Sequence, residues 1–197
     1  IPAGYIVRDA ADYDVPGLTY AASVSGNGKN AAIIADSKYG YRGLSDGTLV
    51  STLINSAVSP DPYPERGIHK ITLSVGIFPD CPKFMEDSAQ SAVRKLTYQS
   101  TGSHKGGLPA SASLFNAETD GAVVSAVGVS DDGKLIIRMY SVSDDKKAVS
   151  FDFGKKVVSA FAVDLLEKQL TAAVSFEGSV VRAEIEPHTL LTLKIEL

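Results

Sequence analysis

Two short segments alternate strictly between apolar and small or polar residues, and this period of two constrains the fold more than any other feature of the chain. In residues 71–77, ITLSVGI, the apolar side chains take every odd position, and residues 191–197, LTLKIEL, alternate in the same way. Successive side chains of a strand point to opposite faces of a sheet. Each segment is therefore predicted to be a strand with one buried face.

Turn residues predict how further strands are joined. Residues 123–142 contain two strand-like runs around Ser130-Asp131-Asp132-Gly133-Lys134, and Gly133 can adopt the positive φ that a tight hairpin needs. A second hairpin is predicted at Glu177-Gly178-Ser179, and Gly26-Asn27-Gly28-Lys29 is interpreted as a turn between two strands rather than a phosphate-binding loop. Other strands are predicted at residues 18–25, 31–36, 48–55, 148–153 and 157–163.

A helical period occurs in one place. Between residues 83 and 101, which contain no Gly or Pro, apolar side chains recur at Ala89, Ala92, Val93 and Leu96. One short helix among many strands predicts an all-β fold of antiparallel β-sandwich type. The glycine-rich segment 100–109 lacks any period, so we expect it to connect two domains, residues 1–112 and 113–197.

Composition narrows the function classes. Apolar residues make up 44% of the chain and charged residues 21%, which is ordinary for a soluble globular protein. The net charge of −4 gives no electrostatic reason to expect a nucleic acid or an anionic membrane as partner. No signal peptide is recognisable and the single cysteine, Cys81, excludes an internal disulfide, so a cytoplasmic location is favoured. The chain opens at Ile1-Pro2, and we expect it to be part of a longer protein.

The motifs of common catalytic centres are missing. His69, His104 and His188 lie far apart, and no G-x-S-x-G, H-E-x-x-H or Cys/His cluster accompanies them. Glycosidases use a pair of carboxylates, but the spacing of the available Asp and Glu residues selects no pair. The sequence therefore predicts neither a catalytic residue nor a metal site in this chain.

Two segments are unusually dense in polar, aromatic and proline residues. Residues 36–42 read DSKYGYR, and residues 59–69 read SPDPYPERGIH. The three prolines of the second segment fix φ, so that this loop can hold a defined shape. Both segments are consistent with functional loops at the end of a sandwich and also with structural turns whose hydrogen bonds are satisfied.

These two segments belong to a series of motifs that resembles the C-terminal region of glycoside hydrolase family 38, the α-mannosidases. The motifs occur in the order of that family, in which the motif at residues 36–41 usually reads N-D-S-K-Y-G-Y. They are Ile1-Pro2-Ala3-Gly4-Tyr5-Ile6, Asp36-Ser37-Lys38-Tyr39-Gly40-Tyr41, Gly47-Thr48-Leu49, Pro60-Asp61-Pro62, Gly67-Ile68-His69, Gly107-Leu108-Pro109, residues 135–140 and residues 164–167.

The resemblance implies a part of a larger enzyme. Residues 1–112 would be the later part of a large sandwich similar to that of galactose mutarotase, and residues 113–197 a small terminal β-sandwich. The parent would be a zinc-dependent retaining α-mannosidase whose catalytic aspartates and zinc ligands lie in an N-terminal barrel. This chain would then be inactive alone and hold no cofactor. Its partners would be that catalytic domain and an α-mannoside glycan. We also expect self-association, because a divided sandwich exposes apolar surface or a strand edge.

The same resemblance selects candidate site residues for the rim of the active site or for an interface between domains. They are Asp36, Lys38, Tyr39, Gly40, Tyr41, Asp61 and His69. Tyrosine offers a sugar an apolar face and a hydroxyl, and Gly40 would permit a tight turn between the two rings. Whether these side chains contact sugar or only the catalytic domain stays open. Two alternatives for the whole chain are a free-standing carbohydrate-binding module, although the chain has no Trp, and a purely structural domain.

Overall fold

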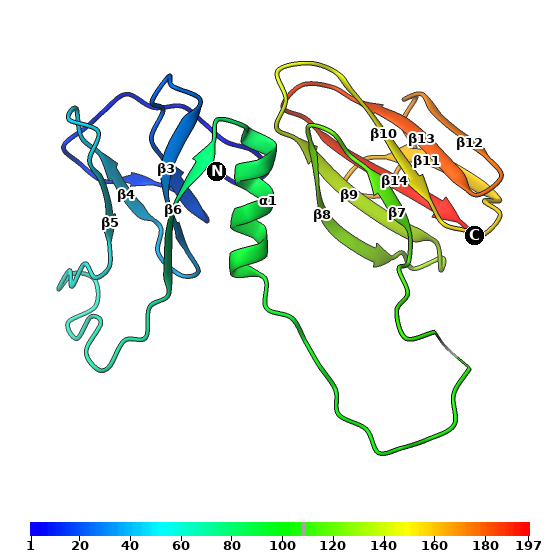
Figure 1. The fold of residues 1–197 in the computed structure, drawn as a ribbon, viewed down its shortest axis with the longest axis horizontal. Helices are drawn as coiled ribbons and strands as arrows, with labels where there is room; N and C mark the ends of the chain where they lie inside the picture. The colour runs from blue at the N-terminus through cyan, green and yellow to red at the C-terminus, as the bar shows by residue number, and fades with distance from the viewer. Residues whose placement is uncertain (108) are drawn as a thin grey trace. The chain divides into compact units, whose positions relative to one another are not determined.

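The computed structural model describes residues 1–107 and 109–197, so Leu108 of the motif Gly107-Leu108-Pro109 lies outside the described residues. Within this part the chain forms fourteen strands and one helix, and every strand pair is antiparallel (Figure 1). The prediction of an all-β antiparallel fold with one short helix is confirmed. The chain divides into two compact units, Ile1–Lys95 and Leu96–Leu197.

The first unit contains two three-stranded sheets and the helix. One sheet has the order β1-β4-β5 and the other the order β2-β3-β6. The strands are β1 (Val15–Pro16), β2 (Tyr20–Ala22), β3 (Lys29–Ala35), β4 (Gly40–Gly43), β5 (Leu49–Thr52) and β6 (Leu73–Pro79). The turn predicted at residues 26–29 is confirmed, because β2 and β3 pair antiparallel on either side of it.

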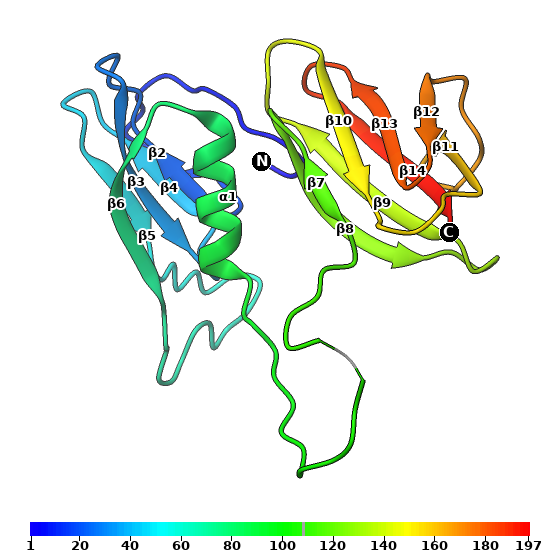
Figure 2. The same ribbon diagram turned by 45° about the vertical axis from the view of Figure 1, so that its right-hand side comes forward.

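Helix α1 (Pro82–Val93) covers one face of the β2-β3-β6 sheet (Figure 2). Met85 and Ala89 of the helix form a buried cluster with Ala32 and Ile34 of β3. Proline suits the first turn of a helix because its fixed φ is already helical and its missing N–H has no partner there. The prediction that the helical stripe extends to Leu96 was wrong, since the chain becomes extended at Arg94 and leaves Leu96 exposed.

The second unit is a sandwich of two four-stranded sheets, with the orders β12-β13-β10-β7 and β11-β14-β9-β8. One buried cluster joins Phe151 and Val181 of the first sheet to Ile137 and Leu193 of the second. The strands are β7 (Asn116–Glu118), β8 (Ala122–Val129), β9 (Leu135–Ser141), β10 (Lys147–Asp152), β11 (Ser159–Val163), β12 (Val174–Glu177), β13 (Val180–Ile185) and β14 (Leu190–Glu196).

Both predicted hairpins of this unit are confirmed. Gly133, with φ 81°, lies in the turn between β8 and β9, and Gly178, with φ 60°, lies between β12 and β13. The terminal strand is also confirmed, but the prediction that only one face is buried was wrong. Leu191, Leu193 and Ile195 of β14 are buried, and so are Thr192 and Lys194 on the other face. These elements form where sequence places a residue that tolerates positive φ between two alternating runs.

Strand β6 differs from its prediction in one respect. The strand forms where the alternation of residues 71–77 places it, but Val75 and Ile77 are 78% and 74% exposed. The helix packs on the other face, where Phe78 contacts the buried cluster. The prediction of a strand was right, and the prediction that its apolar side is buried was wrong, because α1 covers the opposite side.

The segment between α1 and β7 connects the two units. The described residues from 94 to 115 form neither helix nor strand. The boundary predicted near residue 112 falls within this segment, while the division by contacts follows Lys95. No helix of the described residues is long and apolar enough to cross a membrane.

Candidate functional site

The motif at residues 36–41 forms the corner between β3 and β4. Asp36 and Ser37 are exposed, and the Ser37 hydroxyl donates a hydrogen bond to Asp36 Oδ1 at 2.9 Å. The loop is shorter than the sequence indicated, because Gly40 and Tyr41 already belong to β4 and pair with Thr52 and Ser51 of β5. The motif is therefore a turn followed by the start of a strand.

Tyr41 belongs to the core of the first unit. It is 2% exposed, and its hydroxyl donates a hydrogen bond to the carbonyl oxygen of Lys38 at 2.9 Å. Burial raises the pKa of the Tyr41 hydroxyl. A Cβ added at Gly17 would lie 2.7 Å from the Tyr41 ring, so this glycine makes room for it. The Tyr41 ring is therefore almost fully buried, and its hydroxyl holds the turn.

Gly40 lies where its neighbours approach closely, and not in a turn. It lies in β4 opposite Thr52, and it is not among the residues with positive φ. A Cβ at this position would lie 3.2 Å from Asp14 Oδ2 and 3.3 Å from the Cβ of Thr52. The predicted reason for Gly40, a tight turn between two rings, was wrong.

Asp14 fastens the N-terminal segment to this sheet. Its carboxylate forms an ion pair with Arg42 at 3.1 Å and accepts a hydrogen bond from the Thr52 hydroxyl. Arg42 also donates to the carbonyl oxygen of Asp12 at 3.1 Å. The hydrogen bond from Thr52, together with Arg42, lowers the pKa of Asp14. Sequence reasoning missed Asp14 because no local pattern links it to partners 28 and 38 positions away.

Tyr39 also remains accessible, as Asp36 and Ser37 do, and Lys38 is partly accessible. Tyr39 is 58% exposed, while its carbonyl oxygen accepts a hydrogen bond from the backbone N–H of Gly17 at 2.9 Å. Lys38 is half-buried, and its carbonyl oxygen is held by Tyr41. Hydrogen bonds from Gly17, which follows β1, and from Tyr41 of β4 thus hold the backbone of both residues, while the Tyr39 ring faces solvent.

Asp61 and His69 lie in the loop between β5 and β6. Asp61 Oδ1 accepts a hydrogen bond from the backbone N–H of Tyr63 at 2.9 Å, and His69 Nε2 lies 2.7 Å from the carbonyl oxygen of Glu65. The Glu65 carboxylate in turn accepts from the backbone N–H of Asn55 at 2.8 Å. These hydrogen bonds stay within residues 55–69, so the two side chains shape their own loop.

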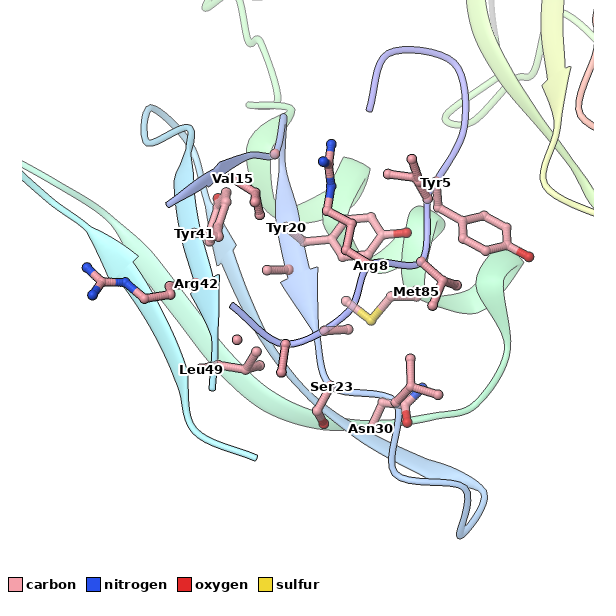
Figure 3. Close-up of a pocket in the computed structure, with 18 of the residues that line it drawn as sticks. Tyr5, Arg8, Val15, Tyr20, Ser23, Asn30, Tyr41, Arg42, Leu49 and Met85 are labelled. Atoms are coloured by element: carbon pink, nitrogen blue, oxygen red, sulfur yellow. The ribbon is translucent and has the colours of Figure 1, made fainter. Parts of the chain in front are cut away.

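A cavity of about 570 Å³ lies in the first unit, beneath the N-terminal segment (Figure 3). Tyr5, Tyr20 and Met85 line it around the start of α1, and Tyr41 and Arg42 lie at the side of β4. This volume lies in the range of small-molecule sites, which are mostly apolar with a few convergent polar groups. Tyr41 thereby connects the predicted motif to the cavity.

A buried acid and a tyrosine are among the polar residues of the cavity wall. Glu86 is buried in α1, accepts a hydrogen bond from Gln90 Nε2 at 3.0 Å, and is also hydrogen-bonded to Tyr20. Burial and, secondarily, the Glu86 carboxylate raise the pKa of Tyr20 well above its usual range. The Tyr20 hydroxyl therefore stays protonated and donates to the carboxylate.

Sequence reasoning missed Glu86, although a signal existed. Glu86 precedes Ala89 by three positions and Val93 by seven, so it shares the apolar stripe of the helix. A carboxylate on such a stripe must find a buried partner. Separately, among the described residues no three His, Cys, Asp or Glu side chains gather where they could hold a metal ion.

Comparisons with known proteins agree with the sequence motifs and with the fold. Residues 121–193 match the family model described as the glycosyl hydrolases family 38 C-terminal beta sandwich domain. The fold is similar to the crystal structure of an alpha-mannosidase from Enterococcus faecalis V583, with a TM-score of 0.76 and 19% sequence identity. That likeness covers 94% of this chain and 22% of the α-mannosidase chain, so this chain spans about a fifth of the protein it matches. No curated protein matches the chain.

The family match covers most of the second unit, from the residue before β8 into β14. The fold likeness extends over both units. The resemblance indicated by the sequence motifs is therefore confirmed, and the second unit of this chain is similar to the C-terminal β-sandwich domain of glycosyl hydrolase family 38.

Proposed function

We propose that this chain is a non-catalytic C-terminal part of a zinc-dependent retaining α-mannosidase, and that it supports and edges the active site of an N-terminal catalytic barrel. The observation that carries the proposal is the match of residues 121–193 to the family 38 C-terminal β-sandwich. The fold likeness to about a fifth of an α-mannosidase chain supports it. In this proposal residues 1–112 are the later part of a mutarotase-like sandwich, and residues 113–197 are the terminal one.

Zinc belongs, in this proposal, to the catalytic domain. The described residues offer no group of three ligands, so they do not fit the metal. The contribution of this chain is positional: a rigid surface that faces another domain's active site.

Lys38 and Tyr39 form the part of that surface that we assign to the contact with the catalytic domain or the glycan. The Tyr39 ring is exposed, and its backbone is fixed through Gly17. An exposed ring on a fixed backbone loses little conformational freedom on binding, and it combines an apolar face with a hydroxyl. Tyr41 acts through Lys38, since its hydroxyl holds that residue's carbonyl oxygen.

The test is complementation of activity. The pure chain, with zinc added, should not hydrolyse an aryl α-mannoside, and co-expression with the catalytic part of its parent should restore activity that the catalytic part lacks alone. Tyr39→Ala in the restored enzyme should lower kcat/KM. Zinc-dependent turnover by the chain alone, lost on chelation, would contradict the proposal, as would a catalytic part that is equally active without the chain.

A second candidate is a free-standing carbohydrate-binding module. It is favoured by the exposed Tyr39 ring and by the cavity, which Tyr5, Tyr13, Tyr20 and Tyr41 line. Calorimetry with mannose oligosaccharides should then show binding that Tyr39→Ala abolishes. Absence of heat at millimolar sugar would exclude this candidate and leave the first untouched.

A further inference from the structure

Strand β6 has one edge that no strand of the described residues covers. The sheet order β2-β3-β6 places it at the side of its sheet, and within the described part of the chain only β3 pairs with it. The strand is seven residues long, and Figure 2 shows it as an extended outer strand of the first unit. Natural proteins usually protect such an edge with charged residues, prolines or bulges, because its backbone groups are open to another strand.

The usual protection is missing along this edge. Residues 71–79 read ITLSVGIFP and contain no charged side chain, and the only proline stands at the end of the strand. Val75 and Ile77 are exposed on the face that α1 leaves uncovered. Charges flank the segment instead, with Lys70 before it and Asp80 after it. Such a neutral segment of high β-propensity favours pairing with a further strand.

We propose that β6 pairs antiparallel with β6 of a second copy of this chain, in a register centred on Val75. A two-fold axis at Val75 places this residue opposite its own counterpart. Leu73 then lies opposite Ile77 of the second copy, and Lys70 lies opposite the second copy's Asp80. The result is one continuous six-stranded antiparallel sheet.

This register is selected by both apolar contact and charge. Leu73, Val75 and Ile77 lie on one face of the strand, so the pairing joins them into a continuous apolar row across two strands. The charges match at the same time, because each end of the paired strands brings a lysine to an aspartate. Centring on Ser74 would instead place Lys70 opposite Phe78, and centring on Gly76 would place it opposite Pro82.

The structure positions Asp80 for this role. Its Oδ1 accepts a hydrogen bond from Asn30 Nδ2 at 2.9 Å, and its backbone N–H donates to the carbonyl oxygen of Gly28 at 3.0 Å. Both contacts come from the β2–β3 turn and fix the residue at the end of β6. Because α1 packs on the opposite face, pairing along the edge leaves the buried cluster of Ala32, Met85 and Ala89 intact.

The oligomeric state of the chain tests the proposal directly. Sedimentation across a range of concentrations should show a dimer, and Val75→Lys should convert it to a monomer because it places two lysines opposite each other on the axis. Val129→Lys is the matched control: Val129 is 72% exposed on strand β8, which lies at the edge of a sheet in the second unit. That variant should remain dimeric.

Engineered disulfides test the register. Opposite Cα atoms of an antiparallel pair lie about 4.5–5.5 Å apart, which a disulfide spans. In a Cys81→Ser background, Val75→Cys should cross-link with itself. Leu73→Cys and Ile77→Cys should cross-link only when the two variants are mixed. In either variant alone, the two cysteines lie four residues apart along the paired strands, which is about 13 Å.

Several results would overturn the proposal. A monomeric chain would overturn it, and the edge of β6 would then be open to a strand from another part of a longer protein. A dimer that survives Val75→Lys, or that Val129→Lys dissociates, would place the interface elsewhere. Failure of Val75→Cys to cross-link in a dimer, or efficient cross-linking of Leu73→Cys alone, would exclude this register. None of these outcomes bears on the assay for mannosidase activity.

Discussion

The Nζ atom of Lys194 lies 2.9 Å from Oδ1 of Asp132, although the lysine is buried in the terminal sandwich. The same Nζ lies 2.9 Å from Oε2 of Glu167. Lys194 belongs to β14, Asp132 to the turn after β8, and Glu167 to the turn after β11. One ammonium group thus ties two turns to the terminal strand. Glu167 has φ 63°, an unusual backbone conformation for a residue with a side chain.

Lys194→Met is expected to destabilise the second unit. Methionine keeps most of the buried aliphatic stem but leaves the carboxylates of Asp132 and Glu167 without their shared cation. The urea midpoint should fall more than in the control Lys155→Met, because Lys155 is exposed. Equal midpoints in the two variants would show that the ion pairs of Lys194 contribute nothing to stability.

Asp132 makes stability depend on pH in the acid range. A hydrogen bond from Ser130 and the contact with Lys194 lower the pKa of Asp132 from 3.8 to about 2. Since the folded-state pKa lies below the unfolded one, the stabilisation is complete above about pH 4 and is lost as the pH falls toward 2. Asp132→Asn should therefore lose less stability than the natural chain between pH 5 and pH 2, measured by urea unfolding. Parallel curves for the two proteins would contradict this assignment.

Phe151 anchors the core between the two sheets of the second unit. It is fully buried, and its ring meets that of Phe115 edge to face at a centroid distance of 5.4 Å. Phe151→Ala should lower the free energy of unfolding by about 3–5 kcal/mol, the usual effect of removing a buried aromatic side chain. The matched control is Phe176→Ala, whose ring is partly exposed and which should cost much less. Similar losses in both variants would place the core elsewhere.

The elements that the sequence predicted well are those determined locally. The hairpins around Gly133 and Gly178 need only two alternating runs and one residue that tolerates positive φ. Strands β1, β4 and β7 were missed because they have two to four residues and form only through their partners. Their positions depend on contacts between segments far apart in the chain, which a period of two cannot indicate.

The candidate site shows the same difference between features that are determined locally and features that depend on distant contacts. The motif at residues 36–41 was recognised from its composition, but no sequence pattern distinguished the role of Tyr39 from that of Tyr41. Their exposure differs because Tyr41 lies in β4 with its ring against Gly17 and the core, whereas Tyr39 lies two positions earlier, before β4 begins, and its ring is 58% exposed. Which face of β6 the helix covers was likewise set by Ala32 and Ile34 on the neighbouring strand.

The two tyrosines of the motif should separate stability from function. Tyr41→Ala removes a buried ring and should lower the free energy of unfolding of the first unit by about 3–5 kcal/mol. Tyr39→Ala removes an exposed ring and should change it by less than about 0.5 kcal/mol. Urea unfolding of the isolated chain measures both values. A large loss in Tyr39→Ala would show that this ring packs within the unit, and its role at an interface would then fail.

Gly17→Ala tests the packing beneath the motif. The added Cβ would lie 2.7 Å from Cδ2 and 2.9 Å from Cε2 of the Tyr41 ring, so the ring must move or the strands must separate. Overpacking of this kind typically costs about 1–3 kcal/mol.

Gly17→Ala should also loosen the turn, because the backbone N–H of residue 17 donates to the Tyr39 carbonyl oxygen and the Tyr41 hydroxyl donates to the Lys38 carbonyl oxygen. In the variant, hydrogen exchange should therefore speed up at the backbone amide of residue 17. Gly102→Ala, where a Cβ meets open space, is the control and should leave stability and exchange unchanged. Unchanged exchange in Gly17→Ala would mean that the turn is held independently of the Tyr41 ring.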